Sequence, residues 1–167
     1  MFEADFFLVQ GASNRRDHCG DEYRINQAAR ALFHQAQRIG RVGRWWAALR
    51  TRQESGRLLC LADFGAAHPI ATTCRPRVET VNLSQIRGTV GRQHDFDARF
   101  HPLKSSLGHR WMRVATARHE ERSLPPVALI QIEETYFVQD GHHRVSVARA
   151  RGELDIEAEV TNWKIEA

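Results

Sequence analysis

Residues 136–152 read YFVQDGHHRVSVARARG. The first three residues are aromatic or branched, which favours a β-strand, and Gly141 follows where that strand should break. Alanines at 148 and 150 and Gly152, a good C-terminal cap, favour a short helix after the turn. Val145 and Val147 prefer a strand by propensity, so the local sequence alone leaves the helix open. Together with the resemblance described below, these features predict a strand, then a turn at Gly141, and then a helix.

The flanking residues extend this pattern into an α/β domain. Residues 127–132 form a second apolar run, and a turn at 133–135 would pair it with 136–138 as a hairpin. Residues 156–160 predict another strand, and 77–83 a strand of uncertain register. A serine at 105 or 106 could cap a helix that runs to about residue 121. The pattern therefore predicts a hairpin, further short strands and a helix.

The turn at 140–144 predicts an anion site. Gly141 allows the backbone to approach a ligand closely, and the first amide groups of a helix have no partner within the helix. If His142, His143 and Arg144 occupy the first turn, their N–H groups and the helix dipole face one point. Arg144 adds a guanidinium that could hold two phosphate oxygens. We expect a phosphate-binding site there.

Other residues could complete this site. We expect Arg92, Lys104, Ser105 and Ser106 to converge on the same phosphates. A positive environment lowers the pKa of a histidine, so His142 or His143 could handle a proton. The alternative is that one of the two histidines packs against the sheet as a capping residue.

A metal site has weaker support in the sequence. Adjacent histidines point in different directions on a helix, and no HExxH spacing is present. Phosphoryl transfer usually needs a carboxylate and a magnesium ion, for which Asp140, Asp95 and Asp97 are the candidates. A DFD triplet in a loop is more often a cap and a solvated charge.

The quoted turn, together with Leu124-Pro125-Pro126-Val127, resembles the ParB/sulfiredoxin-like superfamily. That group includes the nucleotide-binding domain of chromosome-partitioning ParB proteins, sulfiredoxins, a free serine kinase and ParB-like nucleases. The resemblance covers roughly residues 78–161, about half of the chain. It implies a compact α/β domain with a small mixed sheet, in which Gly141, His143 and Arg144 match the phosphate-holding turn.

Two departures narrow the functions that the resemblance implies. Sulfiredoxins carry a reactive cysteine where this chain has His142, which argues against repair of cysteine sulfinic acid. Ser146 stands where partitioning ParB proteins usually have an arginine, which argues against a CTP clamp. The DGHHR form is most similar to the free serine kinase and to uncharacterised ParB-like proteins. It implies binding of ATP or CTP, with Mg²⁺, and hydrolysis or phosphoryl transfer in which Asp140, His142 and His143 take part.

A basic helical arm precedes this domain. Residues 1–20 read as a loose lead-in, and apolar residues from 25 to 39 recur at helical spacing after Asp21, a plausible N-cap. Gly40 and Gly43 interrupt the pattern, so we expect a helical hairpin or a kinked helix ending near residue 56. We place a boundary between an arm and connector, 1–76, and the domain, 77–167.

The arm suggests two kinds of partner. Seven arginines and no acid lie between residues 23 and 53, and two adjacent tryptophans stand at 45 and 46. Arginines that hold phosphates beside stacking aromatics are typical of nucleic-acid surfaces; the candidates are Arg41, Arg44, Arg50 and Arg52. Tryptophans more often anchor a core or a subunit interface, which would make the arm a homodimer contact. A DNA-binding or nuclease-like module and a non-catalytic regulatory scaffold are therefore the alternatives to a nucleotide enzyme.

The composition limits which other classes of protein this chain can belong to. The 167 residues are 42% apolar and 26% charged, typical of a globular chain. No apolar run approaches the roughly 18 residues that span a bilayer, and the acidic start does not suggest a signal peptide, so we expect a cytoplasmic protein without a membrane partner. Three cysteines without a CxxC spacing argue against a disulfide framework or structural zinc.

Overall fold

The computed structural model describes residues 4–50, 57–63, 70–72 and 75–165, with side chains over most of these ranges. It confirms the α/β class and the mixed sheet. The helical segments are α1 (Ala4–Arg50), η1 (Leu83–Gln85), η2 (Ser105–Leu107), α3 (Gly108–His119) and α4 (His142–Ala150). The strands of the described ranges are β1 (Leu59–Cys60), β2 (Ile70–Thr72), β3 (Arg77–Asn82), β4 (Ile86–Thr89), β5 (Val127–Ile132), β6 (Thr135–Asp140) and β7 (Asp155–Ile165).

The sheet has the order β1-β4-β6-β5-β7-β2, and β3 pairs with a different part of β7. The expected hairpin of β5 and β6 is antiparallel and occupies the centre. β4 runs parallel to β6, and β7 runs parallel to β5. β2 and β3 are both antiparallel to β7, which combines the two pairing types in one sheet.

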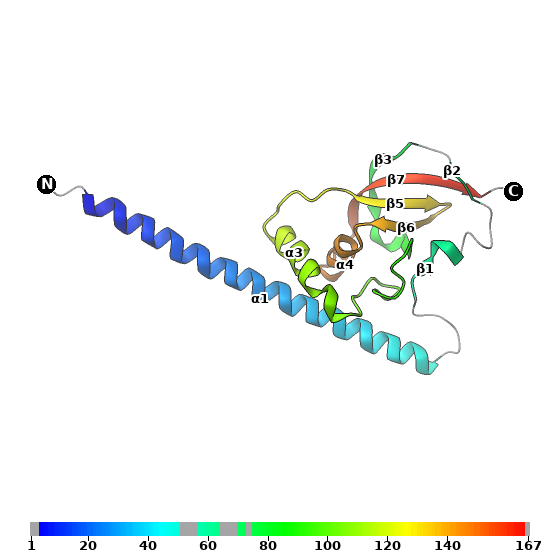
Figure 1. Cartoon of the computed structure of the whole chain (residues 1–167), viewed down its shortest axis with the longest axis horizontal. Coiled ribbons are helices and arrows are strands. Elements are labelled where there is room, and N and C mark those ends of the chain that lie inside the picture. The colour runs from blue at the N-terminus through cyan, green and yellow to red at the C-terminus, as the bar shows by residue number, and fades with distance from the viewer. Residues whose placement is uncertain (1–3, 51–56, 64–69, 73–74, 166–167) are drawn as a thin grey trace.

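Both faces of the hairpin are covered. Leu129 and Val138 pack in a cluster that includes Val145 of α4, on the face where α3 and α4 lie (Figure 1). Ile130 and Phe137 point to the other face, where Leu61 covers them. Side chains alternate between the faces of a strand, so apolar residues at nearly every position of the two strands imply burial on both sides.

α1 is one continuous helix, and the predicted hairpin or kink at Gly40 and Gly43 is wrong. A side-chain carbon at Gly40 would lie 2.8 Å from Cβ of His101, so this glycine permits close packing instead of breaking the helix. A glycine inside a helix costs only about 1 kcal/mol, which packing offsets. The loose lead-in and the N-cap at Asp21 are also wrong, because helix runs through residues 4–20. Residues 51–56 of the expected second helix lie outside the described residues.

The middle of α1 packs against α3, and its N-terminal part projects away from the body (Figure 1). Phe33 and Ala36 are buried with Trp111 of α3 and Val147 of α4, as the apolar stripe predicted. The Phe33 and Trp111 rings lie 5.5 Å apart. The indole N–H of Trp111 donates to Ser146 Oγ at 2.8 Å, which joins α3 to α4.

The predicted boundary near residue 76 stays a prediction. The strands β1 and β2 precede it, but they pair with β4 and β7, which follow it. The serines at 105 and 106 form the 3-10 turn η2 and do not cap α3, which begins after it. Cys60 is a buried free thiol. Among the described helices, none is long and apolar enough to cross a bilayer.

Candidate functional site

The turn between β6 and α4 places a glycine where no other residue fits. Gly141 has φ 95°, a left-handed conformation that side chains disfavour. A Cβ there would also lie 2.6 Å from Cγ1 of Val127. Gly141 precedes the helix and no side chain caps it, so α4 begins with amide groups that face an open pocket.

This pocket, which we call the α4 N-terminal pocket, has a volume of about 230 Å³. It is lined by the turn and by side chains of neighbouring segments: Arg92, Arg110, Val114, Leu124, Pro125, Asp140, Gly141, His142, His143 and Arg144. The structure thus brings together six of the predicted residues. Ser105 and Ser106 do not line it.

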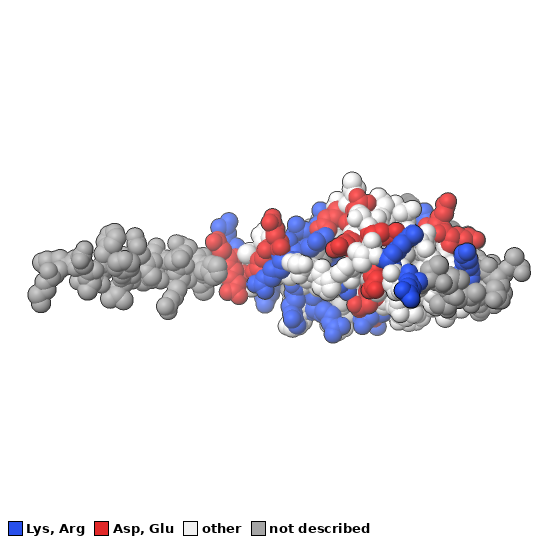
Figure 2. Space-filling view, turned by 90° about the horizontal axis from the view of Figure 1, so that it is seen from above, with Lys and Arg blue, Asp and Glu red and all other residues white. Residues whose placement is uncertain are grey.

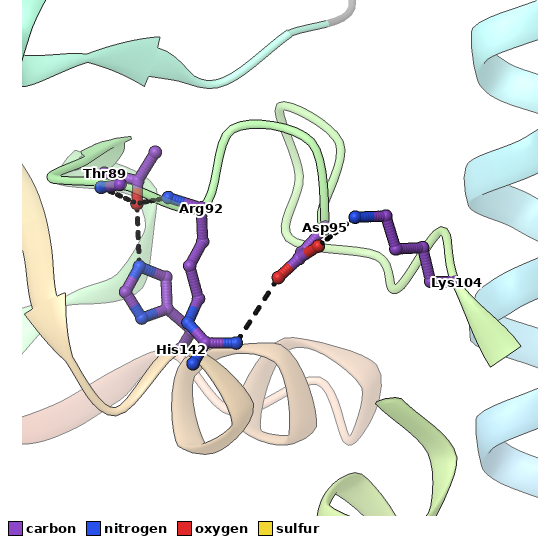
Figure 3. Close-up of polar contacts among 6 residues, drawn as sticks. Thr89, Arg92, Asp95, Lys104 and His142 are labelled. Carbon is purple, nitrogen blue, oxygen red and sulfur yellow. Dashed lines mark hydrogen bonds and ion pairs between the residues drawn. The ribbon is translucent and has the colours of Figure 1, made fainter. Parts of the chain in front are cut away.

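His142 is buried and tied to the sheet. Its Nε2 lies 2.7 Å from Oγ1 of Thr89, as Figure 3 shows. The same oxygen accepts backbone N–H groups of Gly91 and Arg92. With both lone pairs of Oγ1 in use, the hydroxyl proton is directed at Nε2, so the neutral ring carries its proton on Nδ1. His142 is therefore held in one tautomer, and its ring stacks on Phe96.

Both histidines are neutral at physiological pH. Burial and the nearby Arg92 lower the pKa of His142 from 6.5 to about 4. Burial, Arg92 and Arg110 lower the pKa of His143 to about 4 as well. Nδ1 of His143 is buried and has no hydrogen-bond partner among the described residues. Buried polar atoms are rarely left unpaired, so this atom has bonding capacity to spare beside the pocket.

Arg92 and Lys104 meet through Asp95. The Asp95 carboxylate lies 3.3 Å from Nη1 of Arg92 and 2.7 Å from Nζ of Lys104 (Figure 3). Burial alone would raise the pKa of Asp95, but the hydrogen bond and charge of Lys104 and the charge of Arg92 bring it below its ordinary value. Asp95 therefore orients Arg92 at the pocket and also binds Lys104, which is not among the residues that line the pocket.

Arg144 is engaged within the protein. Its guanidinium donates to the carbonyl oxygens of Pro125 and Pro126 and to the carboxylate of Asp140. The Arg144 side chain is 14% exposed, whereas that of Asp140 is 80% exposed. The guanidinium thus anchors the 125–126 segment to the turn. A direct phosphate contact from Arg144 stays a prediction.

Asp97 serves the structure of its own loop. Its buried carboxylate accepts the N–H groups of Arg99 and His101 and faces Nδ1 of His101 at 3.0 Å. These contacts match the capping interpretation of the triplet. Within the described ranges, no group of three or more potential ligands could hold a metal ion.

Two polar residues were not predicted: Arg110, which lines the pocket, and Thr89, which does not line it but holds His142. Thr89 lies between Gly88 and Gly91, and only its pairing with His142 reveals its role. Arg110 lies on α3 and reaches the pocket because that helix packs beside α4. No sequence motif marks either residue as part of a site, because Thr89 is an isolated threonine and Arg110 is one arginine among many.

The candidate nucleic-acid residues lie apart from this pocket. Arg41 and Arg44 are exposed on α1, and Nη2 of Arg41 reaches Ser105 Oγ at 3.5 Å. Trp45 and Trp46 are 60% and 49% exposed and meet edge to face. The side chain of Arg50 and all of Arg52 lie outside the described residues. Acidic and basic side chains are interspersed on the face in Figure 2.

The chain shows structural similarity to known proteins. No protein-family model matches the chain, and no curated protein matches it. Among solved structures, sulfiredoxin from Arabidopsis thaliana is similar over 53% of this chain and 89% of its own, with 17% identity and a TM-score of 0.42.

Proposed function

We propose that this protein binds a nucleoside triphosphate, ATP or CTP, through its phosphate groups in the α4 N-terminal pocket. The observation that carries the proposal is an uncapped helix start beside Arg92 and Arg110. Amide groups, the helix dipole and guanidinium groups all favour an anion at one point. His143, whose buried Nδ1 has no hydrogen-bond partner among the described residues, lines the same pocket.

The size of the pocket limits which part of the nucleotide it holds. A volume of about 230 Å³ suits phosphate groups and is below the usual range for a whole drug-sized ligand. The sugar and base would therefore lie toward solvent, and the phosphates would supply most of the affinity. Inorganic triphosphate should bind at the same place.

Hydrolysis or phosphoryl transfer is the activity that we propose for the bound nucleotide. His143 is neutral at pH 7, so it could accept a proton from water or an acceptor hydroxyl. His142 is also neutral, but its Nε2 already accepts from Thr89 and its Nδ1 carries a proton, so it would position the turn. Asp140 is the exposed carboxylate that lines the pocket, and it could orient a magnesium ion that enters with the phosphates. The magnesium ion would neutralise phosphate charge.

Thermal stabilisation tests the binding. Ligand at about 100 times its dissociation constant should stabilise the fold by about 2.7 kcal/mol. We expect ATP, CTP or inorganic triphosphate with Mg²⁺ to raise Tm, and Arg110→Ala to reduce affinity about tenfold. Arg113→Ala removes an exposed arginine of the same helix and should behave like wild type. If none of the three ligands changes Tm, the proposal is wrong.

Phosphate release separates an enzyme from a scaffold. The rate of phosphate release from the nucleotide should exceed the rate in buffer alone, and it should fall in the His143→Gln variant. Nucleotide binding without release above buffer would instead favour the non-catalytic regulatory scaffold.

The exposed tryptophans favour DNA binding as a second candidate function. Trp45 stands beside Arg44 on α1, an aromatic and cationic pair suited to stacking and phosphate contact. Affinity for a labelled DNA should then fall steeply with salt and drop with Arg41→Ala/Arg44→Ala. If those variants leave DNA binding unchanged while Trp45→Ala abolishes self-association, the arm is a homodimer contact.

A further inference from the structure

A second pocket lies at the other end of α4. It has a volume of about 630 Å³, which is within the usual range for small-molecule sites. We call it the arginine pocket, because its lining includes Arg57, Arg87, Arg99 and Arg149. His101 also lines it. None of these residues lines the α4 N-terminal pocket.

Segments far apart in the sequence supply the four guanidinium groups. Arg57 precedes β1, and its backbone pairs with that of Asp97. Arg87 belongs to β4, and Arg99 to the loop that Asp97 organises. Arg149 belongs to the last turn of α4. The tertiary fold therefore concentrates positive charge that the sequence spreads over about ninety residues.

This charge is poorly neutralised. Arg57, Arg87 and Arg99 form no ion pair with another described residue. Among the described residues that line the pocket, Glu153 is the only acid. Its carboxylate already pairs with Arg118 and Arg151. Like charges that converge without a counterion disfavour the fold, and a bound anion would relieve their repulsion.

Arg149 forms the fixed floor of the pocket. Its Nη2 donates to the carbonyl oxygens of Leu83 and Ile86, and its guanidinium lies 5.1 Å from the centre of the Phe100 ring. Burial lowers the pKa of Arg149, with a further contribution from Arg99 that Asp97 opposes. Asp97 is the counter-charge that acts on Arg149, and a buried cation favours a further anionic partner.

Two exposed leucines also line the pocket. Leu59 and Leu154 line it and are 49% and 74% exposed. Exposed leucines next to arginines suit a ligand that has both an apolar body and oxyanion groups. A bare inorganic ion would leave the leucines in water.

We propose that the arginine pocket binds a small organic polyanion, whose phosphate or carboxylate groups meet Arg87, Arg99 and Arg149 and whose body covers Leu59 and Leu154. Guanidinium groups bind both kinds of oxyanion in bidentate fashion. The site is separate from the proposed nucleotide site and does not depend on it.

Calorimetric titration of the full chain tests the proposal. The probes are phenyl phosphate, phthalate and inorganic phosphate, each in 150 mM salt. The protein carries Arg92→Ala/Arg110→Ala, which disables the α4 N-terminal pocket, so failure of the nucleotide proposal cannot affect the result. We expect phenyl phosphate or phthalate, which share an aromatic body, to bind more tightly than inorganic phosphate, and the tighter of the two identifies the oxyanion.

Added variants decide whether the arginine pocket is the site. Arg87→Ala/Arg99→Ala should weaken the tighter probe about tenfold or more. Arg30→Ala/Arg113→Ala removes the same charge from exposed helix positions and should change affinity less than threefold. Circular dichroism verifies the fold of each variant. Three outcomes would overturn the proposal. One is equal affinity in both double variants, and another is no binding of either organic probe. The third is equal or tighter binding of inorganic phosphate, which would mean an adventitious ion only.

Discussion

Thr89 and His142 connect the end of β4 to the first residue of α4, with 2.7 Å between Oγ1 and Nε2. The threonine hydroxyl is wholly buried and also accepts two backbone N–H groups. One side chain therefore sets both the tautomer of His142 and the position of the loop that carries Arg92.

Thr89→Val should lower the free energy of unfolding by about 1–3 kcal/mol, because it leaves buried polar groups without a partner at nearly constant volume. Thr89→Ser keeps the hydroxyl and should lower the free energy of unfolding by less. Urea denaturation measures both variants. Equal stability of the valine and wild-type proteins would show that the hydroxyl contributes nothing.

Stability should depend on pH through the two histidines. Their pKa is about 4 in the folded state and about 6.5 in the unfolded chain. The unfolded chain then binds more protons between these values, so stability falls as pH falls from 6.5 to 4, by about 1.4 kcal/mol per pH unit for each histidine. Urea denaturation at pH 7, 6 and 5 measures the slope, which His143→Gln should reduce. An NMR titration with either pKa near 6.5 would contradict the assignment.

Arg144→Ala should act mainly on stability. It removes contacts to the carbonyls of Pro125 and Pro126, and hydrogen bonds from a charged group contribute about 1.5–3 kcal/mol each. Asp140→Asn breaks only the exposed ion pair and should cost less than about 1 kcal/mol. If the two variants are equally stable in urea, the carbonyl contacts are not what Arg144 supplies.

Gly141→Ala should destabilise more than Gly152→Ala. Both glycines have positive φ, so both substitutions strain the backbone by roughly 1 kcal/mol. Only at Gly141 would the new Cβ also meet Val127, whereas nothing lies within 4 Å at Gly152. Thermal unfolding compares them, and an equal loss of stability would mean that Val127 moves aside freely.

Phe33→Ala tests whether α1 belongs to the folded core. Phe33 is 3% exposed against Trp111, and truncating such a side chain costs about 3–5 kcal/mol. Ile39, on the same helix, is 48% exposed, so Ile39→Ala should cost less than about 1 kcal/mol. If urea denaturation finds Phe33→Ala as stable as Ile39→Ala, the arm does not support the domain.

The sequence alone determined the centre of the fold. Apolar runs at 127–132 and 136–138 predicted β5 and β6, and the helical stripe predicted the buried face of α1. Gly141 and Gly152 bounded α4, but its helical state was predicted only with the family resemblance, because Val145 and Val147 favour a strand. These features follow from side-chain periodicity and from backbone preferences, which act within a few residues.

Tertiary structure decided the rest. Gly40 continues a helix because it packs against His101, and Arg144 turns to the carbonyls of Pro125 and Pro126 because they lie within its reach. Arg110 meets the α4 N-terminal pocket, and four distant arginines share another, only because the sheet and helices bring them together. Such pairings depend on distances between segments far apart in the chain, and no local preference encodes those distances.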